Sequence, residues 1–182
     1  NDTLSILTAV MSGAGTGSVT TDGSTITYTP PLNYNGTATV FSFAADNADG
    51  ADSTSVTITV TSVNDAPVAL DDTGTMTEDD SATSFTVLSN DTDTEGDTLT
   101  VSSPTISSGD TTGTVTTDGT TVTYTPSGDF NGTTVIGYTI TDDGTTNGSN
   151  NFLTDTGTLT ITVSEVNDAP IANDVTATIA ED

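Results

Sequence analysis

The segment Val63-Asn64-Asp65-Ala66-Pro67 decides the fold, because it occurs a second time as Val166-Asn167-Asp168-Ala169-Pro170. Each copy follows a run in which Thr alternates with β-branched residues, Thr57-Ile58-Thr59-Val60 and Thr160-Ile161-Thr162-Val163. Such alternation is typical of a β-strand with one buried face. Another short extended run follows each copy. We therefore interpret the segment as a joint between consecutive β-sandwich domains.

A longer internal repeat surrounds the joints. Residues 17–30 match residues 113–126, which lie 96 positions further along, whereas the two joints lie 103 positions apart. The second copy therefore holds about seven more residues. The polar Gly/Asn/Thr composition of residues 144–155 predicts that they form a lengthened loop.

The remaining local signals are those of short strands joined by turns. Asp22-Gly23 and Asp118-Gly119 each lie between two alternating runs, and both predict a β-hairpin. No stretch of the sequence has helical periodicity. Short strands at even spacing predict an all-β chain of tandem Greek-key β-sandwich domains. Tyr28, Tyr34, Tyr124 and Phe130 are then interpreted as core or corner residues rather than as sugar-stacking aromatics.

The strand around Phe41 is expected to be irregular. Phe41 lies five residues past Gly36, whereas Ile136 in the second copy lies four residues past Gly132. A shift of one residue would turn every side chain of the strand to the opposite face. If the large residues of both copies face the core, an extra, bulged residue must lie between Gly36 and Phe41.

The chain ends are out of phase with the repeat. Glu181-Asp182 matches Glu78-Asp79, so the last residues repeat the start of the second copy. We expect residues 1–65 to form a repeat without its opening strands, and residues 66–168 to form a complete one. Residues 169–182 are expected to be the opening strand of a following repeat or a strand donated to the next subunit. In both cases one sheet edge is left bare and able to pair.

The charge of the chain restricts its chemistry and its partners. The 182 residues include 26 carboxylates and no Lys, Arg, His or Cys, which gives a formal net charge of −26. Nucleic acids and anionic membranes are recognised through basic patches, so we expect neither as a partner. No apolar run approaches the roughly 20 residues of a membrane span. Without His, Cys or Lys there is no ordinary general base or triad, and we expect no enzyme.

The carboxylates themselves predict a metal site. Two carboxylates at 4 Å repel each other by about 1 kcal/mol in water, and no basic side chain of this chain can relieve that repulsion. Asp91, Asp93, Glu95 and Asp97 stand at alternate positions of one segment. Calcium, which prefers oxygen ligands, is the expected partner of such a cluster, and a solvated acidic turn is the alternative. An acidic chain without Cys suits calcium-rich extracellular surroundings or a cell surface.

The chain resembles the cadherin-like, Ig-like tandem repeats of large bacterial calcium-dependent surface adhesins and secreted repeat proteins. The resemblance rests on Asn64-Asp65-Ala66-Pro67, on Thr77-Glu78-Asp79, on residues 90–97 and on Tyr138-Thr139-Ile140-Thr141-Asp142. It implies calcium ions at the joints between domains. The residues that it assigns to the upper site are Asn64, Asp65, Asp91, Asp93 and Asp142. Those that begin the lower site are Glu78, Glu165, Asn167 and Asp168, with further partners expected beyond residue 182.

Three functions remain open from the sequence. The first is a structural segment of an extracellular stalk or fibre that calcium makes rigid at its joints. The second is recognition of a glycan or surface protein, for which Phe152-Leu153 is the candidate apolar patch. The third is head-to-tail assembly of identical subunits, in which residues 171–179 lend a strand to the next chain.

Overall fold

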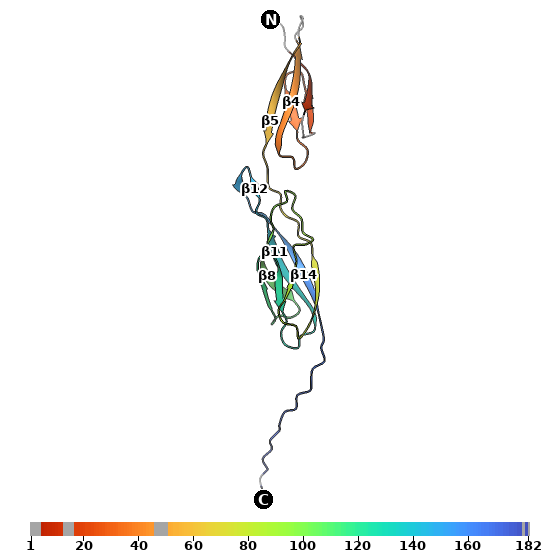
Figure 1. Cartoon of the computed structure of the whole chain (residues 1–182), viewed down its shortest axis with the longest axis vertical. Helices are drawn as coiled ribbons and strands as arrows, with labels where there is room; N and C mark the ends of the chain where they lie inside the picture. The colour runs from red at the N-terminus through yellow and green to blue at the C-terminus, as the bar shows by residue number, and fades with distance from the viewer. Residues whose placement is uncertain (1–4, 13–16, 46–50, 180, 182) are drawn as a thin grey trace. The chain divides into compact units, whose positions relative to one another are not determined.

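The computed structural model describes residues 5–12, 17–45, 51–179 and 181 (Figure 1). Its regular secondary structure over these residues consists of β-strands alone, so the all-β prediction is confirmed. No helix there is long and apolar enough to cross a membrane. The chain divides into two compact units. The first unit is Asn1–Val68, Thr92–Leu99 and Thr141–Asp155, and the second is Ala69–Asp91, Thr100–Ile140 and Thr156–Asp182.

The first unit is built on a three-stranded antiparallel sheet with the order β1-β4-β5, to which a two-stranded β2-β3 hairpin is added. A second small hairpin, β12-β13, also belongs to this unit. The bounds of these strands are β1 Ser5–Ser12, β2 Ser18–Thr21, β3 Ile26–Thr29, β4 Gly36–Ala45, β5 Ala51–Val60, β12 Thr145–Thr146 and β13 Ser149–Asn150.

The second unit is a fuller sandwich with sheet orders β6-β14-β11-β8 and β7-β10-β9, and Figure 1 shows β8, β11 and β14 side by side. Strand β6 pairs in parallel with β14, from Asp72 opposite Leu159 to Thr77 opposite Ser164. The bounds are β6 Asp72–Thr77, β7 Thr83–Phe85, β8 Thr100–Ser108, β9 Thr114–Thr117, β10 Val122–Thr125, β11 Gly132–Thr141 and β14 Thr154–Ser164.

The core of the second unit follows the period of two that the sequence shows. Inward-facing residues alternate with outward-facing ones along each strand, and the buried set is Met76, Val87, Val101, Val122, Tyr124, Ile136, Tyr138, Ile140, Leu159, Ile161 and Val163. In the first unit the buried apolar side chains are those of Ala38 and Val40. The second unit therefore has the larger core among the residues that the structure describes.

Both predicted hairpins are confirmed. Strands β2 and β3 flank Asp22-Gly23, and β9 and β10 flank Asp118-Gly119. In the first turn the Asp22 carboxylate accepts hydrogen bonds from the backbone N–H groups of Ser24 and Thr25, at 2.9 and 2.7 Å. These bonds lower the pKa of Asp22 to about 2. The Asp side chain thus holds the turn that leads into the returning strand.

The predicted bulge between Gly36 and Phe41 is wrong. Pairing of β4 with β5 is regular from Gly36 to Ala45, and the register shift of this sheet lies in β1, between Ile6 and Thr8. The two large aromatic residues do not face the core, because the side chains of Phe41 and Phe43 are 37% and 42% exposed. Phe41 stands opposite Val10 on the outward face. The assumption that the largest apolar residues point inward failed, since the inward positions hold smaller side chains.

The segment expected to be a lengthened loop contains a hairpin. Residues Thr145–Thr146 pair with Ser149–Asn150 across Asn147-Gly148. Both turn residues have positive φ values, 53° and 75°, which is the backbone conformation of a tight two-residue hairpin turn. The Asn-Gly pair was the signal for this turn, and the polar composition of residues 144–155 concealed it.

Candidate metal centre

The backbone N–H and the side-chain amide nitrogen of Asn64, in the first joint, both donate hydrogen bonds. Its backbone N–H donates to Thr146 Oγ1 at 2.9 Å, and its Nδ2 donates to Asp142 Oδ2 at 3.0 Å and to the Asn151 carbonyl at 2.8 Å. The residue is only 5% exposed. Two of these acceptors come from the 144–155 segment, so the extra hairpin of the second copy is what fixes the orientation of Asn64.

The amide oxygen of Asn64 takes no part in these hydrogen bonds. Its Oδ1 atom is buried and has no hydrogen-bond partner in the described part of the chain. A Cβ atom placed on Gly144 would collide with this Oδ1 and with Asp97 Oδ2. Both oxygens therefore point into the same small space beside the Gly144 Cα. Leaving a buried polar atom unpaired is costly, so such a site is expected to receive a ligand.

The acidic loop supplies three more oxygens. Asp93 Oδ1 accepts hydrogen bonds from the backbone N–H groups of Glu95 and Asp97, both at 3.0 Å, whereas Asp93 Oδ2 is buried without a partner in the structure as described. Asp93, Glu95 and Asp97 each have one carboxylate oxygen that lies within 4.8 Å of a carboxylate oxygen of the other two residues. Burial, followed by the nearby charges of Asp93, Asp143 and Asp142, raises the pKa of Asp97.

Asp142 and Asp143, which follow the end of β11, hold this arrangement through hydrogen bonds. Asp142 is 3% exposed, and its Oδ1 accepts from the backbone N–H groups of Leu153 and Gly144 at 2.9 and 3.2 Å. Its Oδ2 is the acceptor for Asn64. Asp143 Oδ1 accepts from the Thr98 backbone N–H at 2.6 Å, which ties the acidic loop to the end of β11. Asp142 thus orients Asn64.

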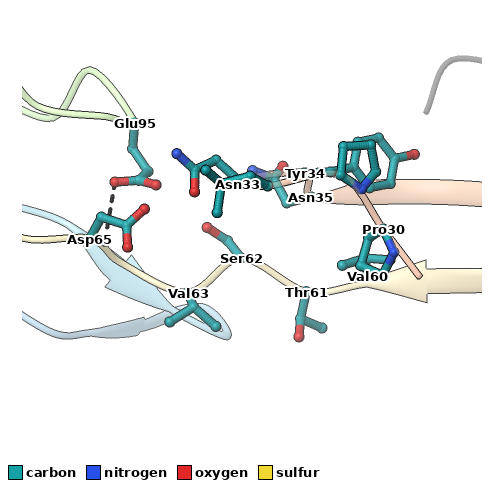
Figure 2. A pocket seen from close by; sticks show the side chains of 12 residues that line it. Pro30, Asn33, Tyr34, Asn35, Val60, Thr61, Ser62, Val63, Asp65 and Glu95 are labelled. Carbon is teal, nitrogen blue, oxygen red and sulfur yellow. Dashed lines mark hydrogen bonds between the residues drawn. The ribbon is translucent and has the colours of Figure 1, made fainter. Parts of the chain in front are cut away.

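Asp65, next to Asn64, is exposed and lies at the rim of the cluster. Its backbone N–H donates to Glu95 Oε2 at 3.2 Å, as Figure 2 shows. The two residues border a pocket of about 370 Å³ within the first unit, whose other lining residues include Tyr34 and Val63. The hydroxyl of Tyr34 donates a hydrogen bond to the Thr37 carbonyl at 2.9 Å.

Asp91, the remaining residue assigned to the upper site, belongs to the second unit. Its Oδ1 accepts a hydrogen bond from the Leu70 backbone N–H at 2.8 Å. The neighbouring Asn90 donates through Nδ2 to the carbonyls of Leu70 and Asp71, both at 3.4 Å. In the second unit, these residues hold the segment that leads into β6.

The residues assigned to the lower site fall into three groups. Glu78 is 6% exposed, and its carboxylate accepts from the Val166 backbone N–H at 2.7 Å and from Asn131 Nδ2 at 3.1 Å. Asp168 joins two exposed carboxylates that the sequence did not suggest, those of Asp79 and Asp129. The oxygens of these three residues lie within 4.8 Å of one another.

The charges of this second cluster act on the Asp168 carboxyl. The pKa of Asp168 is raised, mainly by the charge of Asp79, then by burial and by Asp129 and Glu78. Glu78 and Glu165 are predicted ligands that lie outside the carboxylate triad of Asp79, Asp129 and Asp168. Glu165 is exposed, and Asn167 donates through Nδ2 to the Asp168 carbonyl at 3.3 Å.

Sequence reasoning missed the residues that long loops bring to the two clusters. Gly144, Thr146 and Asn151 frame Asn64 but are neither acidic nor part of a repeated motif. Asp79 and Asp129 lie 50 positions apart in the sequence and meet only through the fold. The alternation of Asp93, Glu95 and Asp97 was the one signal that did indicate a cluster.

The donor set fits calcium. All candidate ligands are carboxylate or amide oxygens, and no basic side chain exists in the chain to compete for them. Calcium binds oxygen at about 2.4 Å, so two oxygens of one ion can lie up to about 5 Å apart. The 4.8 Å limit within each carboxylate triad therefore allows one ion to reach all three oxygens. The acidic clusters are consistent with cadherin-like calcium sites.

The chain is similar in fold to pairs of cadherin repeats. The human protocadherin-24 EC1-2 structure matches with a TM-score of 0.62 and 19% identity, over 91% of this chain and 84% of that one. The human mucin-like protocadherin EC1-2 structure matches with a TM-score of 0.52 and 13% identity, over 87% and 84%. The search of curated proteins found no match.

The amino-acid sequence of the chain also matches a protein-family model. The model described as bacterial Ig domain matches twice, over residues 1–61 and 64–162. Tandem domains of this kind are typically non-catalytic modules, and they usually occur in secreted or surface proteins. The two matched segments together span most of the 182 residues, and the chain belongs to the bacterial Ig domain family.

Proposed function

We propose that the chain is a structural segment of an extracellular adhesin, stalk or fibre, in which calcium at the joints sets the stiffness. The observation that carries the proposal is the buried, unpartnered Oδ1 of Asn64, aimed with Asp97 Oδ2 into the space beside Gly144. A chain without any cationic side chain has no internal positive charge that could neutralise the carboxylates of this cluster.

The mechanism follows from where the ligands stand in the chain. Asn64 belongs to the joint, Asp93 and Asp97 belong to the acidic loop, and the 141–155 segment supports both. Without an ion, the carboxylates repel one another across the loop. An ion that binds Asn64, Asp93 and Asp97 ties the joint to the acidic loop. Its binding energy then stabilises the folded arrangement. The joint segment is then stiffened where it meets the acidic loop.

Removal of calcium is expected to lower the melting temperature of the chain. At a free calcium concentration 100 times the Kd, one bound ion adds about 2.7 kcal/mol to the free energy of unfolding. For a chain of this size that corresponds to a shift of roughly 5–10 °C. Calorimetry with calcium and with EDTA measures the shift, and isothermal titration measures the binding.

A pair of single-charge variants makes the test specific. Asp93→Asn removes a proposed ligand charge, whereas Asp52→Asn removes an equal charge from exposed strand β5, outside both clusters. Calcium should stabilise Asp52→Asn as it stabilises the wild type, and Asp93→Asn much less. Equal melting temperatures of the wild type in calcium and EDTA, without binding heat, would refute the proposal.

A recognition role is the second candidate, and the exposure of Phe152 favours it. This side chain is 54% exposed in the segment that the second copy adds. If the segment binds a glycan or surface protein, Phe152→Ala should abolish at least nine-tenths of the binding signal on a glycan array or in a pull-down. Leu32→Ala, which truncates an even more exposed apolar residue in the first unit, is the matched control. Equal signals from the two variants would exclude a role for Phe152.

A further inference from the structure

The outward face of the β1-β4-β5 sheet carries large apolar side chains. Phe41 and Phe43 of β4 are 37% and 42% exposed, and Val10 of β1, which stands opposite Phe41, is 48% exposed. On the other side of β4, the same face continues with Ser55 opposite Phe41 and Ser53 opposite Phe43. Val10, Phe41 and Phe43, here called the apolar patch, therefore stand together on a face whose β5 neighbours are neutral.

The exposure of the patch follows from the side of the sheet on which it lies. In the second unit, the strands that precede β8 do not cover the matching face, because β6 pairs with β14 and β7 pairs with β10. Ser103 and Thr105 of β8 are exposed there, and Gly137 and Thr139 of β11 are half-buried. A strand that extended the β1-β4-β5 sheet beyond β5 would likewise lie beside the sheet and not over the patch.

The second unit has a hollow where the first unit has the patch. By the 96-residue offset of the repeat, Gly137 matches Phe41 and Thr139 matches Phe43. The strand before them supports this match, because Val40 and Ile136 are both fully buried. The hollow has a volume of about 320 Å³, and its lining includes Ser103 and Thr105 of β8, Gly137 and Thr139 of β11, and Thr156 and Thr158 of β14.

The patch and the hollow complement each other in shape, and neither carries a charge. Phenyl rings protrude from one surface, whereas the other has no side chain at the matching Gly137. No residue that lines the hollow is acidic. In a chain with 26 carboxylates and no basic side chain, contacts elsewhere between two copies bring like charges together. A basic partner would be attracted to the carboxylate clusters and not to this neutral face.

We propose that the apolar patch of one copy of this chain docks into the hollow of a second copy. An aromatic ring of the patch then fills the space that Gly137 leaves, and the exposed apolar area is removed from water. Each copy has one patch and one hollow, so the contact is heterologous and joins copies in series. Neither surface includes a residue of the two carboxylate triads, so the contact is separate from the proposed calcium sites.

Two variants, each of which loses one of the surfaces, test the proposal. Phe41→Thr combined with Phe43→Thr removes the patch, and Thr is what the second copy carries at the position of Phe43. Gly137→Phe fills the hollow with the residue that the first copy carries there, and its Cβ would meet only the Ser107 hydroxyl, at 3.3 Å. Sedimentation of the wild type should show concentration-dependent association. Each variant alone should associate at least tenfold more weakly.

A mixture of the two variants makes the test specific. The Gly137→Phe protein keeps the patch and the other variant keeps the hollow, so the mixture should form mixed dimers with an affinity close to that of the wild-type contact. A monomeric wild type would overturn the proposal. Unimpaired association of Gly137→Phe would also overturn it, because patch would then meet patch. Thr139→Glu, which leaves Gly137 in place and puts a charge in the hollow, should also weaken association at least tenfold.

Matched controls exclude a general effect of apolar surface. Leu32→Thr truncates an apolar side chain that is 92% exposed outside the patch, and Gly128→Phe adds a ring where a Cβ would meet no atom within 4 Å. Both proteins should associate as the wild type does, and weakening equal to that of the patch and hollow variants would refute the proposal.

Salt and EDTA separate this contact from calcium binding. The apolar contact forms between two chains of like charge, so association should strengthen as the salt concentration rises from about 0.1 to 1 M, with or without EDTA. Association that weakened with salt, or that disappeared in EDTA at high salt, would indicate ion-bridged carboxylates and overturn the proposal. Calcium titration of the same variants should show unchanged calcium affinity, whether or not they associate.

Discussion

Replacing Asp110 with Ala is expected to lower the free energy of unfolding of the second unit by about 3 kcal/mol or more. Asp110 is 3% exposed and its carboxylate accepts six hydrogen bonds. They come from the backbone N–H groups of Thr112, Gly113 and Ser127, and from the hydroxyls of Thr112, Ser127 and Tyr124. The variant would leave several buried donors unpaired, each at a cost of about 1–3 kcal/mol.

The first copy shows what the absence of this carboxylate means. The sequence position that matches Asp110 holds Ala14. The hydroxyl of Tyr28, which matches Tyr124, is buried and has no hydrogen-bond partner among the residues that the structure describes. Among the described residues, Tyr124 thus has a carboxylate partner that Tyr28 lacks.

The stability that Asp110 adds should depend on pH. Burial alone would raise the pKa of Asp110, but the hydrogen bonds from Ser127, Tyr124 and Thr112 outweigh it and hold the pKa well below its usual range. A carboxyl whose pKa falls on folding stabilises the folded state above its unfolded pKa, and this contribution is lost as the pH falls. The difference between the wild type and Asp110→Ala should therefore be full at pH 7 and shrink below about pH 4.

Denaturant unfolding of the full chain measures this loss, with near-ultraviolet circular dichroism of the tyrosines as the probe. Asp118→Ala is the control, because Asp118 accepts a similar set of hydrogen bonds from Thr120 and Thr121 but lies in an exposed turn. Its effect should be clearly smaller. If the two variants were equally stable at pH 7, burial of the Asp110 network would not be the source of its contribution.

Gly144→Ala is expected to reduce calcium affinity at least tenfold, which is about 1.4 kcal/mol. The added methyl group would occupy the space into which Asn64 Oδ1 and Asp97 Oδ2 point. Asn64 cannot rotate away cheaply, because its amide nitrogen is bonded to Asp142 and Asn151. The φ angle of Gly144 lies outside the left-handed region, so Ala meets no backbone strain there and the effect comes from the occupied space.

Isothermal titration with calcium checks the loss of affinity, with Gly128→Ala as the matched control. A Cβ on Gly128 meets no atom within 4 Å, and its φ is likewise ordinary. Gly128→Ala should bind calcium as the wild type does. Gly144→Ala should also unfold at a lower temperature than the wild type in calcium-free buffer, because its Cβ would overlap the hydrogen-bonded side chain of Asn64. Unchanged affinity in Gly144→Ala would place the ion elsewhere.

The sequence was sufficient for features that depend on local pattern. Turn chemistry at Asp22-Gly23 and Asp118-Gly119 located two hairpins, and alternation located the strands. The rule that large apolar residues face inward failed at Phe41, because the open first unit buries Val40 and Ala38 instead. The hairpin at Asn147-Gly148 was missed because its polar strands lack apolar alternation.

By itself, the sequence determined the all-β class and the tandem repetition, since these follow from periodicity and from internal matches, and the alternating carboxylates indicated one acidic cluster. The tertiary structure alone decided which oxygens meet. Asn64 depends on acceptors more than 75 positions away, and Asp79, Asp129 and Asp168 come from three separate segments. Such proximity is a property of the completed fold, because chain distance carries no information about which loops of a sandwich share one end.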